Sequence, residues 1–148
     1  MAIAQPLRTE EHVHAYELAV RLPLIASWRA QAAEVVRAWG VPGVVVDAVT
    51  LGVSELLGNV HKHAGDPRCR LELHLTRGGS AASVRLAVQD RSSVLPTVRE
   101  PDCMRDCGRG LWLLRELADD FGSELTAYGK QVWMRCDFGT ARDKVETP

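Results

Sequence analysis

The chain has 148 residues, of which 46% are hydrophobic, and a chain of this length and composition can bury the core of one domain. Its 18 Lys and Arg residues against 19 Asp and Glu residues give a formal net charge of -1 at pH 7. This balance argues against the basic surface on which nucleic-acid binding or attraction to an anionic membrane depends. No window approaches the ~20 apolar residues that a transmembrane helix needs, so we expect no membrane partner.

The N-terminal residues show no signal-peptide pattern, and the chain contains four cysteines: Cys69, Cys103, Cys107 and Cys136. We therefore expect a cytoplasmic protein whose cysteines are reduced thiols rather than a disulfide framework. No repeat, low-complexity tract or linker divides the sequence. Residues 1–148 are predicted to form a single domain, with a core over about residues 12–138 and a polar tail over 139–148.

The first half of the chain predicts one strand and two helices. Residues 12–22 alternate loosely between apolar and polar positions, which indicates a half-buried strand. Over residues 24–39 the apolar positions recur at steps of three and four, which predicts an amphipathic helix. Residues 42–64 begin with a proline, which suits a first helical turn, and carry a second apolar stripe that ends at a Gly-Asp-Pro turn.

The second half alternates hairpins with one helix. Period-two patterns around glycine turns predict the hairpins, and an apolar run after two glycines predicts the helix. A stretch without periodicity lies between them, and loops of its length are usually functional or mobile. In order, the elements are strands 69–76 and 83–89, a loop over 91–107, a helix over 111–117 that ends near 121–122, and strands 123–128 and 131–136.

This order of elements groups the helices against one sheet. We predict an α/β (α+β) two-layer sandwich, with a mixed, largely antiparallel sheet and the helices on one face. The alternation of elements differs from that of a doubly wound parallel fold.

Three polar residues on the second predicted helix form a candidate site. Glu55, Asn59 and His63 are spaced at i, i+4 and i+8, so they line one helix face roughly opposite the apolar stripe. The simpler interpretation is the solvated side of an amphipathic helix. The alternative is a reaction site, in which Asn59 offers a carbonyl oxygen to Mg²⁺ and Glu55 orients or deprotonates an attacking hydroxyl group or water.

Two further features lie where the long loop begins and ends. A buried Asp90 could accept the exocyclic amine of adenine, and a turn-initiating Asp is an equal alternative. Gly108-Arg109-Gly110-Leu111 places two glycines where a loop becomes a helix, so backbone N–H groups can meet phosphate oxygens without a Cβ in the way. Arg109 could add a bidentate phosphate contact, whereas the simpler interpretation of the glycines is a flexible hinge.

Three segments together carry a resemblance to a known family. ELLGNVHKHA (55–64), QDRSSVLP (89–96) and GRGLWLLRELADDFG (108–122) resemble the N box, G1 box and G2 box of the GHKL ATPase superfamily, with an ATP lid before the last. Within it, the chain most resembles the anti-sigma-factor serine/threonine kinases of bacterial partner-switching systems, which are histidine-kinase-like ATPase domain proteins. The resemblance implies a Bergerat-type ATP-binding fold.

The resemblance also implies roles for the matching residues. Glu55 becomes the catalytic base, Asn59 the Mg²⁺ ligand and Asp90 the adenine contact. His63, at the end of the N box, borders the nucleotide. The phosphate turn consists of Gly108, Arg109, Gly110 and Leu111. ATP and Mg²⁺ are the implied cofactors, an anti-anti-sigma (STAS-type) protein is the implied substrate, and a sigma factor and a second copy of the chain are further implied partners.

One departure from the family pattern follows Asp90. The broader pattern is Asp-x-Gly-x-Gly, whereas this chain has Asp-Arg-Ser-Ser-Val over residues 90–94 and no glycine before Gly108. The alternative function is therefore a non-catalytic binding module for a sigma factor or related partner, either gated by nucleotide or independent of it.

Other residue sets have simpler interpretations. Two His and two Cys could bind Zn²⁺, but His-x-His and Cys-x3-Cys are atypical spacings for a structural site: His61, His63, Cys103 and Cys107. A disulfide between the last two is disfavoured in a reducing compartment. The four tryptophans are most simply core or dimer-interface residues: Trp28, Trp39, Trp112 and Trp133.

Overall fold

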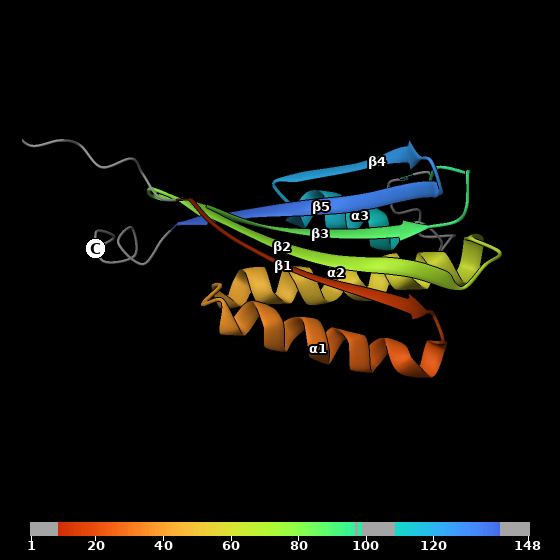
Figure 1. Ribbon diagram of the computed structural model, residues 1–148, viewed down its shortest axis with the longest axis horizontal. Helices are drawn as coiled ribbons and strands as arrows, with labels where there is room; N and C mark the ends of the chain where they lie inside the picture. Colours follow the sequence, from red (N-terminus) through yellow and green to blue (C-terminus); the bar gives the residue numbers. More distant parts are fainter. Residues whose placement is uncertain (1–8, 97, 99–108, 140–148) are drawn as a thin grey trace, which may run out of the picture.

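The computed structural model describes residues 9–96, 98 and 109–139 (Figure 1). These residues form five strands, three α-helices and one short 3-10 helix. In chain order the elements are β1 (Thr9–Ala19), η1 (Leu22–Leu24), α1 (Ile25–Ala38), α2 (Gly43–His63), β2 (Arg68–Gly78), β3 (Ala81–Asp90), α3 (Arg109–Leu117), β4 (Asp120–Thr126) and β5 (Gly129–Gly139).

The helices pack against one five-stranded sheet, as Figure 1 shows. The strand order is β1-β2-β3-β5-β4, and each neighbouring pair is antiparallel. The helices α1 and α2 run side by side in opposite directions, and α3 contacts α2. The predicted α+β sandwich is confirmed, and its sheet is antiparallel throughout the described strands rather than mixed.

The core fills the space between the helices and the sheet. Alternate residues of β2, β3 and β5 are buried because successive side chains of a strand point to opposite faces, and one face meets the helices. Both α2 and α3 contribute to the same hydrophobic cluster. Its fully buried large side chains include Leu56, Leu57, Leu71, Leu73, Leu75, Leu86, Leu114 and Met134.

A glycine lets α2 approach the sheet closely. An ideal Cβ on Gly52 would lie 2.7 Å from Leu86 Cδ2 and would also overlap Met134 Sδ. Both neighbours are fully buried, on β3 and β5 respectively. The absence of a side chain at Gly52 therefore sets the distance between the helix and the sheet.

The helix α2 corrects one sequence expectation. By length and composition alone it could cross a membrane, since its 21 residues include a window of mean hydropathy 1.4. The expectation that no segment has the length and apolar composition of a transmembrane helix is thus wrong for α2. A core helix passes the same test, and half of this window is buried inside the domain. Packing against the sheet and α1 explains the apolar composition.

The third helix ends earlier than the sequence predicts. It stops at Leu117 and β4 begins at Asp120, whereas the sequence predicts a helix to near 121–122 and a strand from 123. Strand β5 holds this segment: the Asp119 N–H donates to the Arg135 carbonyl (2.9 Å), and the Asp119 carboxylate accepts from the Asp137 N–H (2.6 Å). These contacts draw the chain into the sheet as soon as the helix ends.

The two ends of the sheet have different neighbours. The turn between β2 and β3, at Gly79 and Ser80, lies at one end. Asp90 and Lys130 are paired in register at the other end, where β3 ends. Figure 1 shows that this end of β3 lies on the same side of the domain as the C-terminus of α2. Strands of ten residues at about 3.4 Å each separate the two ends by about 30 Å.

The tryptophans divide between the two faces of the sheet. Trp28 and Trp39 are half-buried and pack against the core, as the sequence predicts. Trp133 instead lies on the face away from the helices, against Gly122 and 5.1 Å from the Arg85 guanidinium carbon. It therefore contributes to the surface of the sheet rather than to the core.

Candidate nucleotide site

The polar face of α2 is partly enclosed by the fold. Glu55 and Asn59 are half-buried, one helical turn apart, while the apolar residues around them face the core. His63 is the last residue of α2 and is exposed. A fully solvated helix face would leave all three exposed, so Glu55 and Asn59 depart from the simpler interpretation and His63 follows it.

Glu55 packs directly against the first turn of α3. An ideal Cβ on Gly110 would overlap the Glu55 carboxylate, so only a glycine fits here without displacing the side chain. The sequence places these two residues 55 positions apart, and the packing of α3 on α2 joins them. A carboxylate of α2 is thus held beside the glycine-bearing N-terminus of a helix.

The predicted phosphate turn is described only in part. Gly108 lies outside the described residues, and α3 begins at Arg109. Gly110 is half-buried beneath Glu55. Leu111 is 7% exposed and belongs to the hydrophobic core, so its side chain anchors α3 and only its backbone is suited to a ligand.

Asp90 is buried at the end of β3 and its carboxylate is held in place. Oδ1 accepts a hydrogen bond from the Ser92 backbone N–H at 2.9 Å. The Ser92 hydroxyl oxygen in turn accepts from the Val94 N–H at 3.2 Å. These bonds form a local turn in the segment where the broader family pattern has glycines, because short polar side chains can take backbone hydrogen bonds.

Lys130 completes this arrangement, and the sequence analysis missed it. Its ammonium nitrogen lies 3.3 Å from Asp90 Oδ2, and both side chains are 2% exposed. The sequence prediction began the last strand at residue 131 and assigned Lys130 to the turn before it. The available signal in the sequence was the period of two along the strand. Lys130, Val132 and Met134 are every second residue, so they share one face of β5, and all three are buried.

The backbone around this ion pair is closely packed. An ideal Cβ on Gly129 would overlap the Asp90 carbonyl oxygen and would lie 2.7 Å from Arg91 Cα. Gly129 therefore allows the start of β5 to approach the end of β3, which brings Lys130 opposite Asp90.

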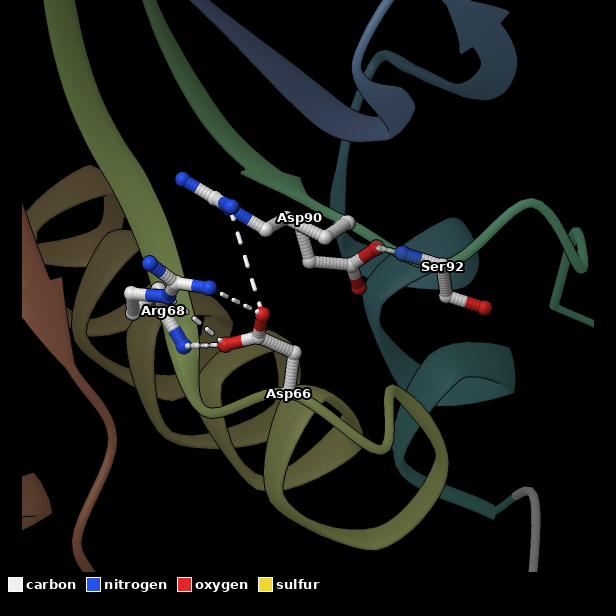
Figure 2. A network of polar contacts seen from close by, with 5 residues as sticks. Asp66, Arg68, Asp90 and Ser92 are labelled. Carbon is white, nitrogen blue, oxygen red and sulfur yellow. Dashed lines mark hydrogen bonds and ion pairs between the residues drawn. The ribbon is translucent and has the colours of Figure 1, made fainter.

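A second carboxylate lies nearby, in the turn after α2. Figure 2 shows Asp66 beside Arg68 and close to the Asp90–Ser92 bond. The Arg91 Nε lies 4.0 Å from Asp66 Oδ2. The Arg68 side chain (2.8 Å) and its backbone N–H (3.0 Å) both donate to Asp66 and lower its pKa to about 2. The turn between α2 and β2 is thereby fixed next to Asp90.

A cavity of about 690 Å³ also opens at this end of the sheet. Its lining includes Asp90, three arginines and Tyr128, but neither Glu55 nor Asn59. It is therefore a different hollow from the polar face of α2.

The oxygen atoms of this site suit a magnesium ion shared with a nucleotide. Mg²⁺ prefers oxygen ligands and is usually held by one or two protein groups together with substrate phosphates. Residues 9–96, 98 and 109–139 contain no cluster of three or more His, Cys, Asp or Glu that could hold a metal by itself. The half-buried Asn59 fits such a shared ion, because its carbonyl oxygen is a ligand of the required kind. The zinc hypothesis involves Cys103 and Cys107, which lie outside the described residues.

The fold is thus an α+β protein, an antiparallel sheet covered by helices, with a half-buried Glu and Asn on one helix and a buried Asp at a strand end. Residues 18–136 match the family model described as the histidine kinase-like ATPase domain. The chain belongs to this family, and membership indicates an ATP-binding, ATP-using protein. A search of curated proteins found no match.

Proposed function

We propose that this chain is a serine/threonine protein kinase that acts as an anti-sigma factor in a bacterial partner-switching system. It transfers the γ-phosphoryl group of ATP to a serine or threonine of an anti-anti-sigma (STAS-type) protein. The same chain holds a sigma factor when that partner is phosphorylated. The proposed location is the cytoplasm, and a homodimer is the proposed assembly.

The contact between Glu55 and Gly110 carries this proposal. A general base has to lie close to the hydroxyl group that attacks the γ-phosphate. Backbone N–H groups at a helix N-terminus bind phosphate oxygens. Glu55 and Gly110 bring these two elements into contact, from residues far apart in sequence. A side chain with a purely solvating role would not need this packing.

The remaining site residues support the same assignment. Asn59 would hold Mg²⁺ together with the phosphates, and the ion supplies positive charge that stabilises the transferred phosphoryl group. Glu55 orients the attacking hydroxyl group and accepts its proton. Asp90 accepts a hydrogen bond from the base, and α3 directs its N–H groups at the phosphates.

A phosphotransfer assay tests the kinase. The purified chain is incubated with Mg-ATP labelled at the γ-phosphate and with STAS-type proteins from the same genome. Label is expected on a STAS-type protein, with transfer reduced about 100-fold or more by Glu55→Gln, since general-base catalysis contributes about 10²- to 10⁴-fold. Glu124→Gln, on the exposed part of β4, serves as the matched control. Absence of transfer to every partner would refute the kinase proposal.

A second candidate function is a binding module that does not turn ATP over. The observation that favours it is that each oxygen of the Asp90 carboxylate already has a protein partner, the Ser92 N–H on Oδ1 and the Lys130 ammonium beside Oδ2. A site of this kind can bind a nucleotide as a conformational ligand. The affinity for the sigma factor, measured with and without Mg-ATP, separates the nucleotide-gated module from the nucleotide-independent one. A change in affinity supports gating by nucleotide, and equal affinities support the nucleotide-independent module.

A further inference from the structure

The buried ion pair at the end of the sheet is not explained by the proposed phosphotransfer chemistry. Both Lys130 and Asp90 are almost completely buried. Removing two charges from water is costly even when they pair, and apolar residues of similar volume are often at least as stabilising. The pair is therefore better explained by its effect on the Asp90 carboxylate than by stability.

The contacts of this carboxylate limit what it can bind. Oδ1 accepts from the Ser92 N–H at 2.9 Å, and Oδ2 faces the Lys130 ammonium at 3.3 Å. An ionised carboxylate has about four acceptor positions, so about two remain for a ligand. With one oxygen held by the Ser92 N–H and the other facing Lys130, the orientation of the carboxylate is fixed, and its remaining positions are acceptors of hydrogen bonds.

We propose that Lys130 is a specificity-determining positioning residue of the nucleotide site. It fixes the orientation of the Asp90 carboxylate, so that the remaining acceptor positions admit a purine with a 6-amino group and reject a purine with a 6-keto group. This inference rests on the proposed function, in which Asp90 contacts the base.

The chemistry of the two purine edges gives the reason. Adenine carries an amino group at position 6, which donates to a carboxylate. Hypoxanthine carries a carbonyl oxygen at position 6, and its N1–H donor lies one ring position away. A carboxylate that is fixed opposite position 6 therefore faces another acceptor, and both groups remain unpaired, which lowers affinity. Without Lys130, Oδ2 loses its partner and only the Ser92 N–H still holds the carboxylate. The group can then turn away from a 6-keto oxygen, so the discrimination should weaken.

Calorimetric titrations with Mg-ATP and Mg-ITP test this inference. We expect the wild-type chain to bind Mg-ATP on the order of tenfold to a hundredfold more tightly than Mg-ITP. Lys130→Met should reduce that ratio by about fivefold or more, because the charge is lost while the length of the side chain is kept. Lys130→Arg keeps the charge and should retain most of the preference.

Two further variants separate specificity from damage to the fold. Val132→Ala opens the core two residues along β5 on the same buried face, so it should weaken both nucleotides by the same factor and leave the ratio unchanged. If Lys130→Met fails to fold, the double variant Asp90→Asn with Lys130→Met keeps the pair neutral. Its ratio should approach one, because a carboxamide both donates and accepts.

The outcomes distinguish this inference from the proposed function. A wild-type chain that binds neither nucleotide would overturn both. A chain that binds Mg-ATP, with an ATP-to-ITP ratio that Lys130→Met or the double variant leaves unchanged, would overturn the role of Lys130 and keep the ATP site. A ratio that falls in Lys130→Met and is kept in Lys130→Arg and Val132→Ala supports it.

Discussion

At the residue scale, the ionisation of Asp66 is tied to the turn between α2 and β2. Its pKa is lowered to about 2 from an ordinary value of 3.8, chiefly by the hydrogen bond from the Arg68 side chain. A carboxyl group with a lowered pKa in the folded state contributes stability above its unfolded pKa. That contribution is lost as the pH falls from about 4 through about 2.

Asp66→Asn should therefore lower the urea midpoint at pH 5 to 7, and its difference from the wild type should shrink as the pH falls from about 4 toward 2. The change should be small because the Asp66–Arg68 pair is partly exposed and screened by solvent. Asp47→Asn, at an exposed position of α2, provides the comparison. A difference that is constant across this pH range would contradict the assignment.

Single residues also show the limit of sequence reasoning at this site. Glu55, Asn59 and Asp90 could be selected as candidates from the sequence because their spacing and neighbours match a pattern, and their place in the site stays a prediction. Lys130 could not be selected in this way, because its partner lies 40 positions earlier and only the register of β3 with β5 joins them. The contact of Glu55 with Gly110 has the same origin, since it depends on how α3 packs on α2.

At the scale of elements, the approach of α3 to α2 makes Gly110 a sensitive position. Gly110→Ala would push the flexible Glu55 side chain aside, and a misplacement of about 1 Å can reduce turnover about 100-fold. Phosphotransfer should fall by about tenfold to 100-fold. The free energy of unfolding should change by less than about 1 kcal/mol, because alanine is the better helix former.

Gly43→Ala is the matched control for this substitution. Gly43 is the first residue of α2, and an added Cβ there meets no atom within 4 Å. Turnover should stay at the wild-type level in Gly43→Ala. Equal loss of turnover in both variants would show that the Glu55–Gly110 contact is not required.

The approach of α2 to the sheet predicts a different pair of results. Gly52→Ala should destabilise the protein by about 1–3 kcal/mol, because its Cβ would crowd Leu86 and Met134 in a close-packed core. Gly58→Ala in the same helix meets no atom within 4 Å and should stabilise by up to about 1 kcal/mol. Chemical denaturation of both variants measures the contrast, and a stabilised Gly52→Ala would contradict the packing.

Element boundaries depended on long-range pairing more than on local pattern. The helices α1 and α2 were predicted within one or two residues, because their apolar periodicity is strong and glycine or proline marks their ends. The end of α3 was wrong because β5 competes for Asp119 and the residues after it, and periodicity contains no information about that competition.

At the scale of the whole molecule, two thiols report on global unfolding. Cys69 on β2 and Cys136 on β5 are both buried in the one hydrophobic cluster. Burial raises the pKa of Cys69 to about 12 and that of Cys136 to about 11. The thiolate is the reactive form, so both residues should be inert toward alkylating reagents at neutral pH while the domain is folded.

An alkylating reagent should therefore modify Cys69 and Cys136 together, at the rate of global unfolding, and should modify both at once in denaturant. Peptide mapping identifies the modified cysteines. The same raised pKa values predict a loss of stability with alkali. Folding is favoured fully below the unfolded thiol pKa near 9, and this contribution falls as the pH rises toward 11 and 12. Rapid labelling of either thiol at pH 8 would contradict a single cooperative core.

The length of the strands also has a practical consequence for experiments on this protein. The exposed turn at Gly79 and Ser80 lies about 30 Å from Asp90, at the opposite end of the sheet. Exposed loop tips tolerate insertions well. A short peptide tag inserted at this turn would fix the domain to a sensor surface with its nucleotide end free, so that nucleotide and partner binding can be measured on one immobilised molecule.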